Sequence, residues 1–357
     1  DFTIIGNSII KTSRLRRASD NLEEDFYHDG INFVNSSDVD VSTWANGNDV
    51  YITKLYNQSS LSGKSDLIQP TIDASANQPK LDIANMAVDF GAYNEHLYLY
   101  AETPKTLLGD ENSSGGDLTI DNYAYACHVK SNTTAVTGNH QMIFNFFPSG
   151  NVTSAMYGER SGVFLAKTQS NGKEDIKFSG LANDTPYSSE GNNYDFEWSL
   201  NTDHNIVMSL DNSNTNNVSL YRDGTHSVNL ATPSKDTLKL NNDSFYYGAS
   251  RPETTTENLA GISKYLIIVD KSLTSDEGSS FNTSPTTWIG DNSLQSNATG
   301  VFSLTNMMNS ISNIIITLGS NSTTLVKDTS YTMDAFVTKL NTDLGSIFTY
   351  KETSNPY

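Results

Sequence analysis

The sequence predicts a mostly β protein: an antiparallel β-sandwich followed by a small C-terminal α+β domain. Short runs rich in β-branched and aromatic residues recur along the chain, bounded by clusters of Gly, Asn, Asp and Ser. Many short strands at close spacing are typical of a sandwich or a barrel. At 357 residues, the chain is long enough for one large β domain and a second, smaller one.

The clearest strand predictions lie in the central part of the chain. They are Glu95–Ala101, Gln141–Phe147, Gly162–Lys167, Asn205–Leu210, Val218–Arg222, Phe245–Gly248 and Lys264–Val269. Asp223 and Gly224 stand between two extended runs, which predicts a tight hairpin. Thr274 and Glu277 have the spacing of a capping box, so we expect one short helical turn after the last of these strands.

A Thr/Ser/Asn/Pro-rich stretch separates the two predicted domains. We place the sandwich at residues 1–281, a linker at 282–300 and a small assembly domain at 301–357. The small domain is predicted to be a ββαβ unit. Its strands are Ile314–Leu318, Thr323–Lys327 and Ile347–Lys351, and its helix carries Met333, Phe336, Val337, Leu340 and Leu344 on one stripe, with Thr332 as N-cap and Gly345 as C-cap.

Composition argues against several classes of function. Twenty-two Lys and Arg against 41 Asp and Glu give a net charge of −19, which repels nucleic acid and anionic membranes. No apolar run reaches the length of about 20 residues that a membrane span needs. The one cysteine, Cys127, rules out an internal disulfide, and the six histidines show no metal-ligand spacing. We therefore expect no bound metal and no membrane insertion.

Two series of motifs resemble known families. The N-terminal series consists of Arg16–Asp25 (RRASDNLEED), Val50–Ser59 (VYITKLYNQS), Gln69-Pro70, Asn77–Leu81 (NQPKL) and Val88–Gly91 (VDFG). It resembles the alpha-L-arabinofuranosidase B catalytic-domain family and related concanavalin A-like modules of phage and large-virus structural proteins. The second series consists of Ser219–Gly224 (SLYRDG), Tyr247–Ser250 (YGAS), Gly261–Val269 (GISKYLIIV) and Leu273–Glu277 (LTSDE). It is similar to the landmarks of laminin-G-like sandwiches.

The resemblance implies a concanavalin A-like jelly roll over roughly residues 14–281, but it does not transfer catalysis. The arabinofuranosidase family carries a Cys-Cys-containing segment around its nucleophile, and this chain has only Cys127. No catalytic residue is carried over, so we expect a protein that is not an enzyme. The C-terminal part, with Ile314–Leu318 and Tyr331–Leu344, is similar to a pattern found in virion proteins of aquatic viruses.

Individual residues offer few site predictions. Arg16 and Arg17 are interpreted as ion-pair partners of nearby carboxylates that anchor the N-terminal segment, rather than as ligands. A structural role rather than a ligand-binding one is likewise preferred for Tyr56 and Gln58. Trp44, Trp198 and Trp288 are interpreted as core residues before sugar-stacking ones. In the loop from Gly109, a solvated acidic surface is preferred because EF-hand spacing is missing. Its weak calcium candidates are Asp110, Glu111 and Asp117.

Our first hypothesis is a virion structural or surface protein, such as a fibre, decoration or capsid-associated protein. It would act by assembling with itself and with other virion or surface proteins, and repeated copies would give avidity for weak contacts with host-surface glycans. The alternatives are a secreted glycoside hydrolase of the arabinofuranosidase type and a bacterial surface adhesin. All three place the chain on a virion surface or outside the cell.

Overall fold

The computed structural model describes most of the chain and divides it into two compact units. The large unit is Ile10–Met308, and the small unit combines Asp1–Ile9 with Asn309–Tyr357. The described residues are 2–3, 10–28, 32–59, 65–69, 76–92, 95, 97–101, 118–120, 122–133, 140–147, 161–167, 174–182, 185–188, 199–211, 218–230, 238–240, 244–249, 258–280, 298–303, 313–318, 321–326, 330–331 and 333–345.

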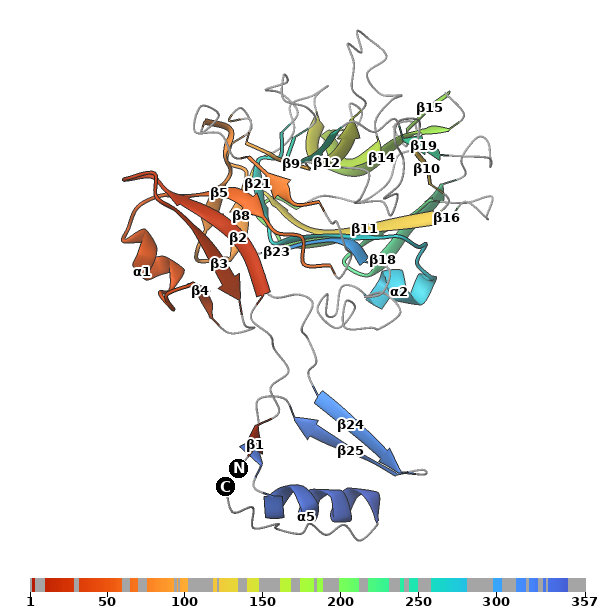
Figure 1. Ribbon diagram of the computed structural model, residues 1–357. Helices are drawn as coiled ribbons and strands as arrows, with labels where there is room; N and C mark the ends of the chain where they lie inside the picture. Colours follow the sequence, from red (N-terminus) through yellow and green to blue (C-terminus); the bar gives the residue numbers. More distant parts are fainter. Residues whose placement is uncertain are drawn as a thin grey trace. The chain divides into compact units, whose positions relative to one another are not determined.

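Figure 1 shows the large unit with many of its strands labelled. The unit contains a long antiparallel sheet in which each strand pairs with its neighbour in the order given next. Its strands are β4 (Phe33–Asn35), β3 (Glu23–His28), β2 (Ile10–Arg17), β5 (Val50–Leu55), β6 (Leu67–Ile68), β9 (Leu99–Ala101), β20 (Ser244–Tyr247), β12 (His140–Phe147), β13 (Ser161–Lys167), β14 (Glu174–Ala182) and β15 (Thr185–Ser188).

A short antiparallel sheet forms the second layer. Its order is β18 (Thr225–Leu230), β17 (Val218–Arg222), β16 (His204–Asp211), β11 (Asn122–Ser131), β22 (Tyr265–Val269) and β23 (Ala298–Ser303). Three further strands, β7 (Lys80–Asp82), β8 (Ala87–Asp89) and β21 (Gly261–Ser263), connect β5 of the long sheet to β11. Strands β10 (Leu118–Ile120) and β19 (Leu238–Leu240) pair beside β14.

The two sheets enclose one hydrophobic core, because alternate residues of each strand point toward the other sheet. Leu15, Phe26 and Phe144 of the long sheet and Tyr125 and Ile268 of the short sheet belong to this core. The ring centroids of Tyr125 and Phe144 lie 4.6 Å apart across the two layers. The predicted fold class, a mostly β antiparallel sandwich, is confirmed.

The short sheet is apolar on its other face as well. Ala126, Val207, Tyr221 and Ile267 form a second buried cluster there. Helix α2 (Ser275–Ser280) covers part of this face, and a Cβ built on its Gly278 would lie 2.5 Å from the Tyr221 ring. Strand β11 is therefore buried on both sides, which explains its burial along almost its whole length.

Two local sequence predictions are confirmed in this unit. Asp223 and Gly224 both have positive φ, 51° and 77°, as the tight turn between β17 and β18 requires. The backbone N–H of Thr274 donates to Oε2 of Glu277 at 2.7 Å, and Glu277 N–H donates to Oγ1 of Thr274 at 3.3 Å. These reciprocal bonds form the predicted capping box at the start of α2. Helix α1 (Val41–Ala45) begins after Asp40, whose side chain accepts from Ser42 N–H.

The described residues of the small unit form two strand pairs and one helix. Strand β24 (Asn313–Leu318) pairs with β25 (Asn321–Val326), and β1 (Phe2–Thr3) pairs with β26 (Ser330–Tyr331). Helix α5 (Met333–Leu344) ends at Gly345, whose φ of 63° fits the predicted C-cap. Leu340 and Leu344 are its buried residues, and Asn321 of β25 donates to the Leu344 carbonyl at 3.1 Å.

Several boundaries differ from those expected. Strand β23 falls partly in the predicted linker, yet it pairs with β22 and so belongs to the large unit, while β1 belongs to the small one. The expected strand Glu95–Ala101 is shorter, because only Leu99–Ala101 is extended and paired. The expected strand Ile347–Lys351 and the N-cap Thr332 lie outside the described residues.

Within the described part of the chain, none of the helices has the length and apolar character that crossing a membrane demands.

Candidate functional site

One face of the long sheet carries a row of polar and aromatic side chains. Directly paired residues of neighbouring strands project to the same side of a sheet. The register joins Arg14 of β2 to Lys54 of β5, Lys54 to Ile68 of β6, Ile68 to Tyr100 of β9, and Tyr100 to Tyr246 of β20. These side chains therefore share the face that points away from the sandwich core.

A second row runs beside the first on the same face. Arg16 pairs with Tyr51, Tyr51 with Lys80 of β7, and Lys80 with Asp89 of β8. Between Arg14 and Leu15, a register shift in the pairing of β2 with β5 offsets the alternation. Tyr51 and Lys54, three residues apart, thereby come to lie on one side. We call this surface, with Tyr51, Tyr56, Tyr100 and Tyr246, the tyrosine face.

Cations flank the two tyrosines of this face that lie on and just after β5. Lys11 Nζ lies 4.3 Å from the centroid of the Tyr56 ring, and Lys54 Nζ lies 5.4 Å from it. The Arg16 guanidinium carbon lies 4.5 Å from the Tyr51 centroid, and Lys80 Nζ lies 5.9 Å away. Such cation–π contacts hold the rings in place and leave their edges beside charged groups.

Carboxylates pair with most of these cations. Asp25 of β3 lies 2.7 Å from Lys11 Nζ and 3.4 Å from Arg14 Nη1, and it accepts from the Tyr56 hydroxyl at 2.8 Å. Desolvation would raise the pKa of Asp25, but the hydrogen bonds from Lys11 and Tyr56 outweigh it and the pKa is lowered. Desolvation and the bond to Asp25 raise the pKa of Tyr56. Asp25 is therefore a fixed anion and Tyr56 a neutral donor at neutral pH.

Tyr98 links the tyrosines at the other end of the first row. Its ring centroid lies 6.5 Å from that of Tyr100 and 5.7 Å from that of Tyr246. Tyr98 is buried, whereas Tyr100 and Tyr246 are half-buried and keep part of their surface in solvent. The first row thus begins with charged groups and ends with an aromatic cluster.

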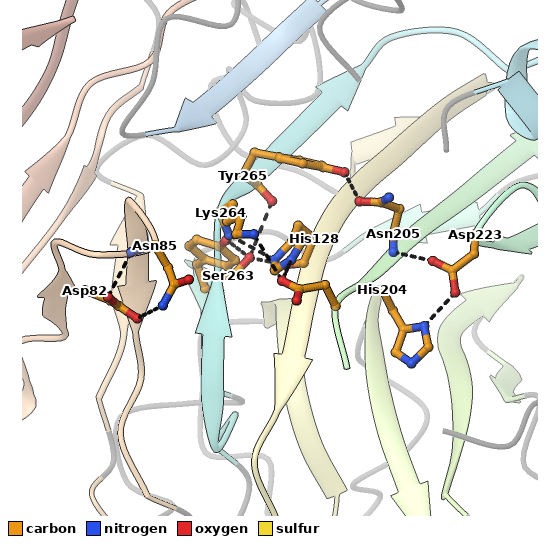
Figure 2. Close-up of polar contacts among 11 residues, drawn as sticks. Asp82, Asn85, His128, His204, Asn205, Asp223, Ser263, Lys264 and Tyr265 are labelled. Carbon is orange, nitrogen blue, oxygen red and sulfur yellow. Dashed lines mark hydrogen bonds and ion pairs between the residues drawn. The ribbon is translucent and has the colours of Figure 1, made fainter. Parts of the chain in front are cut away.

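A second polar cluster lies at one end of the short sheet (Figure 2). His128 of β11 is directly opposite Asn205 of β16. Its Nε2 lies 2.7 Å from Oδ1 of Asp203, which is also 3.1 Å from Lys264 Nζ. The backbone N–H of Lys264 donates to Nδ1 of His128 at 3.3 Å, so Nδ1 is unprotonated and the neutral ring carries its proton on Nε2. The Tyr265 hydroxyl donates to the side-chain oxygen of Asn205.

This cluster is built to hold strands rather than to react. Both imidazole nitrogens of His128 are engaged, and the Ser263 hydroxyl donates to the His128 carbonyl instead of approaching the ring. Desolvation lowers the pKa of His128, although Asp203 opposes the shift. Cys127, the neighbour of His128, is buried, and burial raises the pKa of its thiol far above the usual range. The thiol is therefore inert, as a buried apolar residue would be.

The residues singled out in the sequence fall into three groups: expected ion-pair partners, an expected core residue, and residues that lie outside the described ranges. Arg17 does pair with Asp20, at 2.6 Å, but the carboxylates expected for Arg16 pair elsewhere. Trp44 is confirmed as a core residue, 5% exposed and with its ring centroid 5.1 Å from that of Phe26. The remaining candidates lie outside the described residues: Trp198, Trp288, Asp110, Glu111 and Asp117.

Gln58 is buried and donates to the carbonyl of Ser303 at 2.7 Å, so it fastens β23 to the large unit. Sequence reasoning did not find Tyr100, Tyr246 or the cluster around His128, because only the register of the strands brings these residues together. Across the described ranges, no group of three or more His, Cys, Asp or Glu side chains is placed to hold a metal ion.

Comparisons with known proteins return solved structures only. No family model and no curated protein matches the chain. A heptameric SAP-like pentraxin from Limulus polyphemus is 13% identical with a TM-score of 0.31, over 46% of this chain and 72% of the pentraxin. The CBM40 of the Ruminococcus gnavus IT-sialidase, bound to alpha2,3 sialyllactose, is 10% identical with a TM-score of 0.35, over 46% of this chain and 83% of that one.

Domain 4 of an extracellular GH43 arabinanase from Geobacillus stearothermophilus, in complex with arabinotriose, is 12% identical with a TM-score of 0.34, over 64% and 81% of the two chains. With TM-scores below 0.5, these likenesses carry no argument about this chain. The resemblance to the arabinofuranosidase B family and to phage proteins remains a prediction.

Proposed function

We propose that the large unit is a carbohydrate-binding surface module that holds glycans on the tyrosine face. The observation that carries this proposal is the gathering of four half-buried tyrosines, Tyr51, Tyr56, Tyr100 and Tyr246, on one face of one rigid sheet. Flat aromatic rings pack against the apolar faces of sugars, while tyrosine hydroxyls and neighbouring ion pairs offer hydrogen bonds to sugar hydroxyls.

The position of the face on strands also favours binding. Strands fix the tyrosine rings before a ligand arrives, so little side-chain entropy is lost on association. Tyr56 is held by its hydrogen bond to Asp25 and by contacts with two cations. The ring of Tyr98 packs against those of Tyr100 and Tyr246. Each site would still be weak, because a shallow face buries less of a sugar than a closed pocket does.

We propose further that the chain works in many copies, as a structural component of a virion surface or of another extracellular surface. The net charge of −19 keeps such a surface soluble, and the small unit, with its own strands and helix, would contact neighbouring copies or other surface proteins. Avidity would then raise weak glycan contacts to useful strength. The proposed module needs no cofactor, and calcium in the loop of Asp110 stays an alternative.

The test is a glycan array followed by titration of the best hit in solution. The full chain should bind, and Tyr100→Ala and Tyr246→Ala should each weaken binding by about tenfold, which corresponds to about 1.4 kcal/mol. Leu200→Ala is the control, because Leu200 is an exposed apolar side chain that precedes β16 in the chain and belongs to none of the strands of the tyrosine face. Equal affinities for all variants, or no glycan bound by the full chain, would refute the proposal.

A secreted glycoside hydrolase is the second candidate, and Asp89 is the observation that favours it. Desolvation raises the pKa of Asp89, which lies in the row of Arg16, Tyr51 and Lys80. A raised pKa is what a general acid needs, and a glycosidase also needs a second carboxylate across the sugar. Release of nitrophenol from aryl arabinosides by the full chain, abolished in Asp89→Asn, would favour this candidate over a binding module.

A further inference from the structure

Arg16 is a buried cation whose partners are all neutral. The residue is 4% exposed. Its Nε donates to Oε1 of the fully buried Gln78 at 2.8 Å, and its Nη1 donates to Oδ1 of Asn21 at 2.7 Å. Its guanidinium lies over the Tyr51 ring. Gln78 is itself fixed, because its Nε2 donates to the Gln69 carbonyl at 2.8 Å.

The two neighbouring arginines, in contrast, each have a carboxylate partner. Arg14 lies 2.8 Å from Glu23, and Arg17 lies 2.6 Å from Asp20. Glu23 is the residue directly opposite Arg16 in the register, yet its carboxylate turns to Arg14. Within the described part of the chain, no carboxylate lies within 4.0 Å of the Arg16 guanidinium. A charge removed from water without a counter-ion is unfavourable, so this position attracts an anion.

The geometry of Arg16 is suited to an anion from outside. A guanidinium has five N–H donors, and the two bonds to Gln78 and Asn21 leave donors on both terminal nitrogens. Nη2 has no hydrogen-bond partner among the described residues. It is not completely enclosed by protein, so solvent reaches it. Lys80, on the other side of Tyr51, adds a second positive charge that is paired only at the surface, with Asp49 at 2.9 Å.

We propose that Arg16 binds the carboxylate of an acidic sugar, such as a uronic acid, on the tyrosine face. The two terminal nitrogens would hold the two carboxylate oxygens side by side, since the guanidinium fork matches the carboxylate in shape. The bonds to Gln78 and Asn21 and the Tyr51 ring fix the fork in advance, so its direction is set before the ligand arrives. This inference rests on the proposed glycan binding and names the class of glycan: one that carries a carboxylate.

The experiment compares two sugars that differ at one group, a glucuronide and a glucoside, and adds a sulfated glucose as a second anion. The full chain is titrated with methyl glucuronide, methyl glucoside and glucose 6-sulfate, and binding is followed by NMR. The wild type should bind the glucuronide about tenfold more tightly than the glucoside, as expected for a hydrogen-bonded charge pair. Arg16→Gln should lose this preference, whereas Arg17→Gln, which alters an adjacent arginine that already has a carboxylate partner, should keep it.

Arg16→Lys and Lys80→Gln cover the case in which Arg16→Gln does not fold. Arg16→Lys keeps the charge but loses the fork, so most of the preference should disappear, and Lys80→Gln should reduce it in part. Full preference in Arg16→Lys, or equal affinity for glucuronide and glucose 6-sulfate, would overturn the assignment to a carboxylate. If the wild type binds both neutral and acidic sugars equally, this inference fails and the proposed function stands. If it binds none of the three sugars, this inference fails, and the glycan array alone decides the proposed function.

Discussion

His128 shows how the fold sets the charge of a single side chain. Its ring is buried beside the backbone of Lys264, and the Lys264 N–H that points at Nδ1 would oppose a second proton there. Asp203 favours the protonated form, but Asp203 is half exposed and shares its oxygen with Lys264. Desolvation outweighs Asp203, and the pKa of His128 falls below its usual value.

The lowered pKa makes a prediction about stability against pH. Below about pH 6.5 the unfolded chain binds a proton at this position that the folded chain does not. The free energy of unfolding should therefore be highest above that pH and fall as the pH is lowered, by at most about 1.4 kcal/mol per pH unit. Urea unfolding at pH 7.5 and 5.5 measures the difference.

His128→Gln removes the titrating group and keeps a donor for Asp203, so its stability should change less between these two pH values. His226→Gln is the control, because His226 is exposed on the hairpin after β17 and its removal should leave the dependence intact. An unchanged dependence in His128→Gln would show that another group causes it.

Sequence reasoning placed single residues well only where a local rule applies. The capping box at Thr274 and the turn at Asp223 depend on neighbours within three residues, and both are confirmed. The role of Arg16 could not be found in this way, because Gln78 lies 62 residues further along the chain. The motifs Arg16–Asp25 and Asn77–Leu81 nevertheless contain two residues that contact each other, because Arg16 donates to Gln78.

At the scale of elements, residue composition hid the most central strand. Strand β11 has alternating small and aromatic residues, and its two faces belong to two separate buried clusters. Strand β22 is buried on both faces as well, but its run Tyr265–Val269 consists of β-branched, leucine and aromatic residues, whereas Ala124, Ala126 and Cys127 interrupt such a run in β11. The register shift in β5 had a similar effect, because it places Tyr51 and Lys54 on one face against the expected alternation.

Gly261, the first residue of β21, gives a prediction at this scale. Its φ is 148°, and a Cβ there would lie 2.1 Å from the backbone carbonyl oxygen of Lys130 in β11. Backbone atoms of a central strand cannot move aside, so Gly261→Ala should lower the free energy of unfolding by more than about 2 kcal/mol.

Gly47→Ala is the matched control for Gly261→Ala. Gly47 also has a positive φ, 77°, but no heavy atom lies within 4 Å of the place that an alanine Cβ would take. It should lose only about 1 kcal/mol, the conformational part of the penalty. Similar losses in the two variants, measured by urea unfolding, would show that the contact with Lys130 does not decide the effect.

At the scale of the whole molecule, the large unit forms its main hydrophobic core from its own residues. Its two sheets contribute most members of the main hydrophobic cluster, and β23 is held by β22 and by Gln58. We therefore expect a chain of residues 10–308 to fold alone, with cooperative unfolding and with the glycan affinity of the full chain. Loss of cooperative unfolding in calorimetry would show that the large unit depends on the small one.

The pairing of β1 with β26 makes the large unit an insertion within the small one. Thr3 pairs with Ser330, so the first strand finds its partner only after more than 300 further residues. Ribosomes add roughly 5–20 residues per second, and the first strand therefore waits for tens of seconds while the sandwich is completed. During synthesis the sandwich can therefore fold before the small unit has all of its strands.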